Sequence, residues 1–234
     1  TNGKNNIAMG AVLSIWHDCR EAGLKNPECA ALPSPEALEK AAAHTAINDV
    51  IVDREKHTVY LRDPGMTLDV GAVAKGYAVE KIAAYLEARG ISGYYLNVGG
   101  NVRTVGVRGD GEPWRVGIEN PDPAGEPRNL RVLGLDDRSL VVSGSYQRFY
   151  VVDGKSYHHI IDPATLQPAA YYTSLAVLCR SSAMADALST ALFCMPCDEA
   201  VALIESMDGV EAFFVLKDGT QRATSGFEEY CLTQ

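Results

Sequence analysis

Apolar residues recur along the chain at two spacings, which separate predicted helices from predicted strands. Helices are predicted at residues 9–21, 35–46, 183–195 and 198–207, and another starts between Gly71 and Gly76 and ends at Gly90. Ser34 is the expected N-cap of the second helix, with Pro35 at its first helical position. Gly90 is typical of a helix C-terminus.

Short segments with alternating or β-rich patterns predict strands between these helices. They are residues 49–53, 58–62, 94–98, 102–108, 114–119, 130–135, 140–143, 149–152, 157–161, 174–179 and 211–216, followed by a short tail element over 221–230. Strands outnumber helices and mostly follow one another through short turns. We therefore predict an α+β fold with a largely antiparallel sheet and packed helices. Repeats, low-complexity segments and a convincing linker are not seen, which favours a single domain over 1–234.

The charge and composition of the chain exclude some classes of function. The net charge is −9 over 234 residues, so a general nucleic-acid-binding surface is not expected. An anionic ligand would need local devices such as helix N-termini, a few basic side chains or divalent cations. The sequence contains neither an apolar run long enough to span a bilayer nor a signal peptide. The chain opens on Thr1, which suggests that a targeting segment was removed.

Six cysteines are spaced irregularly in a chain too large to need a disulfide framework, which favours free thiols in a reducing or anaerobic setting. Cys194 and Cys197 have the C-x-x-C spacing of redox pairs. Redox thiols usually lie at a helix N-terminus, which lowers their pKa. The sequence predicts this pair at a helix C-terminus, so a redox role is disfavoured.

Asp186 and Thr190 lie on the predicted helix at 183–195, and their spacing of four puts them on one face. The neighbouring residues are small or apolar, where a carboxylate is costly unless it is paired or binds a metal. Carboxylate and hydroxyl oxygens suit a hard cation such as Mg²⁺. The alternative is a partly exposed Asp186 near the first turn, favoured by the helix dipole. The local pattern leaves both open.

Glycines mark two further segments. Gly71 and Gly76 flank a helix start with Lys75 in its first turn, an arrangement that can bind phosphate without matching a Walker or Rossmann motif. A plain amphipathic helix with an N-terminal Asp cap would give the same pattern. Gly99 and Gly100 stand between two predicted strands, where they predict either a close backbone approach or a simple tight turn.

His158 and His159 are adjacent on a predicted strand, so their side chains point to opposite faces. A site in which both bind one metal is therefore not expected. We expect one of them to face a cleft and the other to be packed or solvated.

Six runs occur along the chain in a characteristic order. They are LDVGAVAKGYA at 68–78, NVGGN at 97–101, WRVGI at 114–118, SGSYQRF at 143–149, HHIIDP at 158–163 and ADALSTA at 185–191. Together they resemble the ApbE family, the FAD:protein FMN transferases, from Gly3 to about Leu216. Several motifs in order are far more specific than any one of them.

The resemblance implies a T-fold-like architecture and an enzyme that cleaves FAD with Mg²⁺, moves FMN onto a Thr or Ser hydroxyl of a target protein and releases AMP. It implies that Asp186 and Thr190 ligate Mg²⁺ through their side chains, and Ala72 and Ala183 through their backbones. It assigns catalytic roles to Asp186 and His159. The residues implied to contact FAD are Lys4, Asn5, Asn6, Asp69, Lys75, His159 and Ile160.

The resemblance also implies partners and a location. Family targets are subunits of Rnf-type and Nqr-type membrane redox pumps, reached by a lipoprotein on the extracytoplasmic face of the cytoplasmic membrane. Membrane contact would come only through a lipid anchor that this chain has lost. The family has an N-terminal segment before Gly3 that holds part of the FAD site, so this chain is expected to be truncated. Two alternatives stay open, namely a FAD pyrophosphatase in which water replaces the target hydroxyl, and a flavin-binding module without catalysis.

Overall fold

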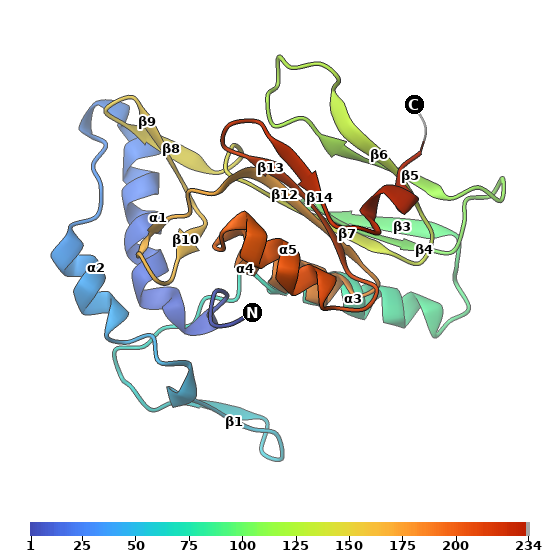
Figure 1. Ribbon diagram of the computed structural model, residues 1–234. Helices are drawn as coiled ribbons and strands as arrows, with labels where there is room; N and C mark the ends of the chain where they lie inside the picture. The colour runs from blue at the N-terminus through green and yellow to red at the C-terminus, as the bar shows by residue number, and fades with distance from the viewer. Residues whose placement is uncertain (233–234) are drawn as a thin grey trace. The chain divides into compact units, whose positions relative to one another are not determined.

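The computed structural model of the protein describes residues 1–232, and contacts divide them into two compact units (Figure 1). The first unit takes residues 71–146 and the chain from Ala170 onward, together with Thr1. The second takes residues 2–70 and 147–169. Neither unit is one continuous stretch of chain, so the expectation of a single domain over 1–234 stays a prediction.

A six-stranded sheet organises the first unit, and every neighbouring pair in it is antiparallel. In order across the sheet, the strands are β14 (Gln221–Ala223), β13 (Glu211–Leu216), β12 (Tyr172–Cys179), β7 (Ser139–Gly144), β4 (Asn101–Val105) and β3 (Tyr94–Val98). The α+β fold with a largely antiparallel sheet is therefore confirmed. The predicted strand at 102–108 ends earlier, because Gly106 takes a positive φ of 58° directly after β4.

Both faces of the central strand β12 are buried, since alternate residues along a strand point to opposite sides. Ala176 and Leu178 belong to an apolar core with Ile118 and Leu133. These partners come from the hairpin of β5 (Trp114–Glu119) and β6 (Asn129–Leu135), and the short helix η4 (Phe227–Tyr230) adds Phe227. The predicted tail element is thus β14 followed by η4.

Helices pack on the other side of this sheet (Figure 1). α3 (Ala74–Glu87) contacts β3 and β4, α4 (Ser182–Phe193) contacts β12 and β7, and α5 (Cys197–Glu205) contacts β13. The strongest helix–helix contact in the unit is between α3 and α4. This pairing positions the candidate site.

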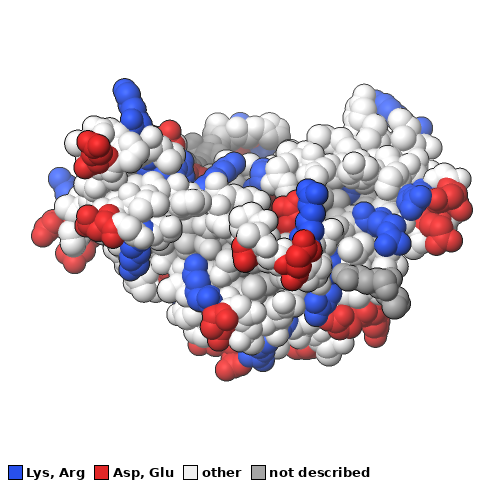
Figure 2. All heavy atoms as spheres, turned by 90° about the horizontal axis from the view of Figure 1, so that it is seen from above, with Lys and Arg blue, Asp and Glu red and all other residues white. Residues whose placement is uncertain are grey.

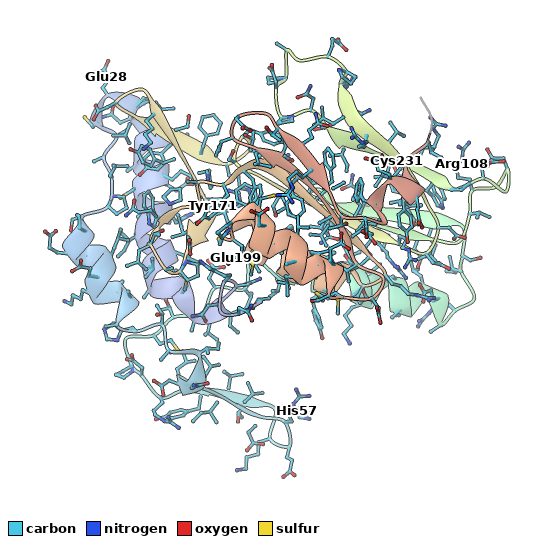
Figure 3. The ribbon with its side chains drawn as sticks, viewed as in Figure 1. Glu28, His57, Arg108, Tyr171, Glu199 and Cys231 are labelled. Carbon is cyan, nitrogen blue, oxygen red and sulfur yellow. The ribbon has the colours of Figure 1, made fainter. Side chains whose placement is uncertain are left out.

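The second unit is built from helices and two-stranded ribbons. Its elements are η1 (Ile7–Met9), α1 (Gly10–Lys25), η2 (Pro27–Cys29), α2 (Pro35–Ala42), η3 (Ile47–Asp49), β1 (Val50–Asp53), β2 (Thr58–Leu61), β8 (Phe149–Val152), β9 (Lys155–His158), β10 (Ile161–Asp162) and β11 (Gln167–Pro168). β1 pairs with β2, β8 with β9 and β10 with β11, all antiparallel. His57 lies at the tip of the first hairpin (Figure 3).

Trp16 of α1 is central to the core of this unit, where it packs with Leu38 and Tyr150, and its Nε1 donates a hydrogen bond to the carbonyl oxygen of Leu166 at 2.9 Å. Ser34 is the N-cap of α2, as predicted, and its side chain accepts from the amide of Ala37. The predicted end of α2 at residue 46 is wrong. The helix stops at Ala42, and the amide of His44 turns back to the carbonyl of Ala41 instead.

Basic and acidic side chains are interspersed over the face shown in Figure 2, and neither charge forms a continuous patch there. Among residues 1–232, none of the helices is both long and apolar enough to cross a membrane.

All six cysteines are free, as predicted. The expectation that Cys194 and Cys197 share a helix C-terminus is wrong for the second of them. Cys194 is the C-cap of α4, but Cys197 is the first residue of α5, because Pro196 breaks the helix between them and starts the next.

Candidate functional site

Asp186 is the buried carboxylate of α4, with 3% of the residue exposed. Ser181 starts the helix as its N-cap and accepts a hydrogen bond from the amide of Met184, and the small residues that follow allow close packing. The alternative of a partly exposed aspartate in the first turn is wrong, since Asp186 lies in the second turn and faces α3. A buried charge requires partners, and α3 supplies them.

The two carboxylate oxygens of Asp186 have different partners. Oδ2 accepts a 2.8 Å hydrogen bond from the backbone amide of Gly76. Oδ1 lies 3.3 Å from Nζ of Lys75, whose side chain is 38% exposed. The amide fixes one oxygen, whereas the lysine holds the other with a long contact from a flexible chain. Oδ1 is therefore the oxygen that can turn to another cation.

Gly76 lets α3 approach α4 closely. A Cβ placed on Gly76 would lie 2.3 Å from the carbonyl oxygen of Ser182, 2.5 Å from Cβ of Asp186 and 3.0 Å from Cα of Ala183. No real side chain fits at these distances, so the short hydrogen bond from Gly76 to Asp186 depends on the missing Cβ. This close approach was not predicted from the helix start alone.

The expected metal ligands belong to one unit. Thr190 follows Asp186 by one turn of α4 and is half-buried, and Ala183 lies against Gly76. Ala72 is in the turn that leads into α3, two residues before that helix begins. Among residues 1–232, no three His, Cys, Asp or Glu side chains converge as a metal site. The available donors are thus one carboxylate, one hydroxyl and backbone carbonyls, an all-oxygen set that fits a hard cation such as Mg²⁺.

Gly99 and Gly100 form the tight turn between β3 and β4. Their φ angles are +57° and +84°, the pattern of a type I′ hairpin turn. The Cβ position of Gly99 is 3.8 Å from Cδ of Lys75. Directly after the turn, the buried Asn101 accepts a hydrogen bond through Oδ1 from the hydroxyl of Ser182, so the same segment also anchors the start of α4.

Lys4 and Asn6 make contacts within the second unit. Nζ of Lys4 lies 3.0 Å from Oδ1 of Asp162, a carboxylate that is 95% buried. Asn6 caps η1 through a 2.9 Å hydrogen bond from the amide of Ala8. Asp162 was not among the residues expected to form the site, although it lies in the HHIIDP motif and precedes a proline, a common signal for a structured turn.

The remaining residues expected to contact FAD differ in accessibility. Asn5 is half-buried and Asp69 is exposed, with the amide of Asp69 bonded to the carbonyl of Ile7 at 2.8 Å. Ile160 is buried, and its backbone is held by Nδ1 of His158 and by the amide of Ala169. A role for these residues in FAD binding stays a prediction.

His158 and His159 have separate hydrogen-bond partners. The buried His158 donates from Nε2 to the carbonyl of Ala169 at 2.8 Å, and its Nδ1 accepts from the amide of Ile160. These partners suit a neutral, structural imidazole. Nδ1 of His159 donates to the carbonyl of Arg148 at 3.3 Å, which leaves Nε2 as an acceptor.

Stability should depend on pH through His159. Burial is the largest cause that lowers the pKa of His159 from 6.5 to about 4. Between these values the unfolded chain binds a proton that the folded chain does not, so stability falls as pH drops from 6.5 towards 4. Urea denaturation at several pH values should give a flatter profile for His159→Gln than for the unsubstituted protein in this window. If stability depends on pH equally in both proteins, His159 is not the group responsible.

Comparison with known proteins supplies the family. The ApbE family model matches residues 1–214. The chain is 35% identical to the FAD:protein FMN transferase of Treponema pallidum over 97% of its own length and 64% of that protein. It is 33% identical to the Haemophilus influenzae protein of the same name, over 88% of this chain and 59% of that one. It therefore spans less than two thirds of either relative.

Solved structures agree with the family match. The ApbE protein of Thermotoga maritima superposes with a TM-score of 0.86 at 30% identity, covering 99% of this chain and 73% of that one. The flavin transferase ApbE of Vibrio cholerae superposes with a TM-score of 0.80 at 29% identity, covering 98% of this chain and 71% of that one. By sequence, by fold and by the order of its motifs, this chain is a member of the ApbE family.

Proposed function

We propose that the protein transfers FMN from FAD onto a Thr or Ser hydroxyl of a protein, with Mg²⁺ bound at Asp186 and AMP as the other product. The observation that carries the proposal is the arrangement of Asp186, whose Oδ2 is fixed by the amide of Gly76 while Oδ1 has a long contact with the flexible Lys75. Relatives that bear the name FAD:protein FMN transferase give the chemistry.

The chain's own residues would hold the cation and the phosphates. Asp186 and Thr190 would hold Mg²⁺ by their side chains, and Ala72 and Ala183 by backbone carbonyls. Bound there, Mg²⁺ would neutralise charge on the pyrophosphate as AMP leaves. In the transfer, the hydroxyl oxygen of the target bonds to the phosphorus of the FMN half, and the bridging P–O bond breaks. Asp186 would orient this hydroxyl.

Lys75 has a different partner with and without ligand in this proposal. Without ligand it pairs with Asp186, and with FAD bound its ammonium group would move onto a phosphate oxygen, a shift that its exposed four-carbon chain allows. The first turn of α3 adds backbone amides suited to the same anion. The lysine thus protects the buried carboxylate until a cation and FAD arrive.

Replacing Lys75 with Gln is expected to raise the KM for FAD about tenfold, because one charge-assisted contact worth about 1.4 kcal/mol is lost. Affinity for Mg²⁺ should stay the same or increase, since a competing positive charge beside Oδ1 is removed. Steady-state kinetics at varied FAD and varied Mg²⁺ separate the two effects. Weaker Mg²⁺ binding with an unchanged KM for FAD would contradict this assignment.

The test of the proposal is incubation with FAD, Mg²⁺ and a candidate target protein. Flavin fluorescence that stays on the target through denaturing gel electrophoresis supports transfer, and AMP should appear in equal amount. Free FMN and AMP without labelled target would support a FAD pyrophosphatase. Bound flavin without either product would support a module that binds flavin without catalysis.

The target class and location belong to the same proposal. Subunits of Rnf-type or Nqr-type redox pumps are the first targets to test, with the protein acting as a lipoprotein on the extracytoplasmic face of the cytoplasmic membrane. Support comes from the motifs that this chain shares with the family. Fractionation of the source cells, followed by detection of the protein and of covalent flavin, tests both points.

A further inference from the structure

Helices α3 and α4 contact each other at two points along α3, which are four residues apart. Gly76 faces Ser182 and Asp186, and four residues later Glu80 faces Ser181 and Ser182. Residues four apart lie on one face of a helix. The later contact on α3 is with the earlier part of α4, so the two helices pack antiparallel. The contact at Gly76 reaches the carboxylate, and the contact at Glu80 reaches the start of α4.

Glu80 is bonded to the N-terminus of a helix other than its own. Its Oε2 accepts a 2.7 Å hydrogen bond from the amide of Ser182 and a 3.2 Å bond from the hydroxyl of Ser181. The Ser181 hydroxyl in turn accepts from the amide of Met184. A carboxylate at this point satisfies amides that have no partner within the helix and complements the positive end of the helix dipole.

Ser182, which Glu80 holds, determines where Asp186 lies. The two residues are one turn apart on the same face of α4, and Ser182 is fully buried. A second bond, from the Ser182 hydroxyl to Oδ1 of Asn101, holds the same residue from β4. With the start of α4 held at two points, neither its rotation nor its axial position is free, and the carboxylate of Asp186 stays within reach of the Gly76 amide.

We propose that Glu80 is a positioning residue for Asp186, acting through the N-terminus of α4 and not by contact with a ligand. The inference rests on the proposed function only in taking Asp186 as the group that binds the cation. Glu80 also lines an open cavity of about 570 Å³, together with Glu87 and Arg103. Its carboxylate is thus held by the two hydrogen bonds and not by tight packing, so other side chains of similar length fit at this position.

Three variants separate the hydrogen bond from the size of the side chain. Glu80→Gln keeps an oxygen acceptor, Glu80→Met keeps the length without an acceptor, and Glu87→Met is the control from the same helix and cavity. The first readout is amide hydrogen exchange at Gly76, which reports its bond to Asp186 without any ligand. The second is Mn²⁺ affinity by electron paramagnetic resonance, measured in the absence of FAD and target.

Glu80→Met is expected to speed exchange at Gly76 by at least about tenfold and to weaken Mn²⁺ binding by a similar factor, equivalent to about 1.4 kcal/mol. For Glu80→Gln, the exchange rate at Gly76 and the Mn²⁺ affinity should stay within threefold of the unsubstituted protein, a difference of about 0.7 kcal/mol at most. Glu87→Met should change neither the exchange rate nor the Mn²⁺ affinity. If Glu80→Met lowers only the melting temperature while exchange at Gly76 stays unchanged, Glu80 merely stabilises the fold and the inference is wrong. Faster exchange in a protein that binds no Mn²⁺ would uphold the positioning role and reject the proposed metal site.

Discussion

Replacing Asp186 with Asn is expected to lower FMN transfer at least about 10²–10³-fold, the usual effect of removing one preorganised group that stabilises charge at a reacting centre. The amide oxygen of Asn can still accept from Gly76, so the fold should survive. The negative charge that would hold a cation is lost. Rates of flavin transfer at saturating FAD, together with Mg²⁺ titrations, measure the effect.

Asp186→Ala removes the acceptor as well as the charge. The Gly76 amide then lacks its partner in a buried setting, which costs about 1–3 kcal/mol of stability. Asp198→Asn is a matched control, because Asp198 lies in the first turn of α5 with a side chain that is 90% exposed and pairs with Arg222. It should change neither rate nor metal binding. If Asp186→Asn transfers FMN at the original rate, the metal site is not at Asp186.

Replacing Gly76 with Ala is expected to destabilise the protein by about 1–3 kcal/mol, the usual range for overpacking, and to lower transfer at least tenfold. The sign of the stability change is informative, because replacing glycine with alanine inside a helix ordinarily stabilises a protein by about 1 kcal/mol. Here the new Cβ would meet the Ser182 carbonyl and Cβ of Asp186, so α3 and α4 must separate. The melting temperature and the rate of FMN transfer should both fall.

Ala84→Gly is the control for Gly76→Ala. Ala84 lies on the exposed side of α3, and glycine there should weaken the helix by about 1 kcal/mol without moving α4. Transfer by this variant should stay near the original rate at temperatures where it is folded. A Gly76→Ala protein that is more stable than the original and fully active would show that the two helices do not meet as closely as described.

The elements that follow from local patterns were predictable. The strands β5 and β13 begin and end at the predicted residues, because an alternating pattern and flanking turn residues mark both ends. Ser34 caps its helix as expected. The end of α2 was predicted at residue 46, but the helix stops at Ala42, where the amide of His44 bonds back to the carbonyl of Ala41.

Two of the expected site residues meet in the structure, but the residues that hold them in place were not predicted. Asp186 and Lys75 were selected from helix spacing and motif order, and the structure brings these two together. Glu80, Asn101 and Asp162 were not selected, because an acidic or amide side chain on a predicted element is most often a solvated surface residue. Their roles depend on partners more than 80 positions away along the chain, which no pattern within a short window reports.

Asp186 and Gly76 are separated by 110 positions along the chain. Forming a contact of such long sequence separation requires the entropic cost of closing the intervening chain to be overcome. A nascent chain that has emerged only as far as β7 already contains Lys75 and Gly76 but has no carboxylate to receive them. Under the proposed function, the cation site would therefore be complete only after α4 has been synthesised and has docked against α3.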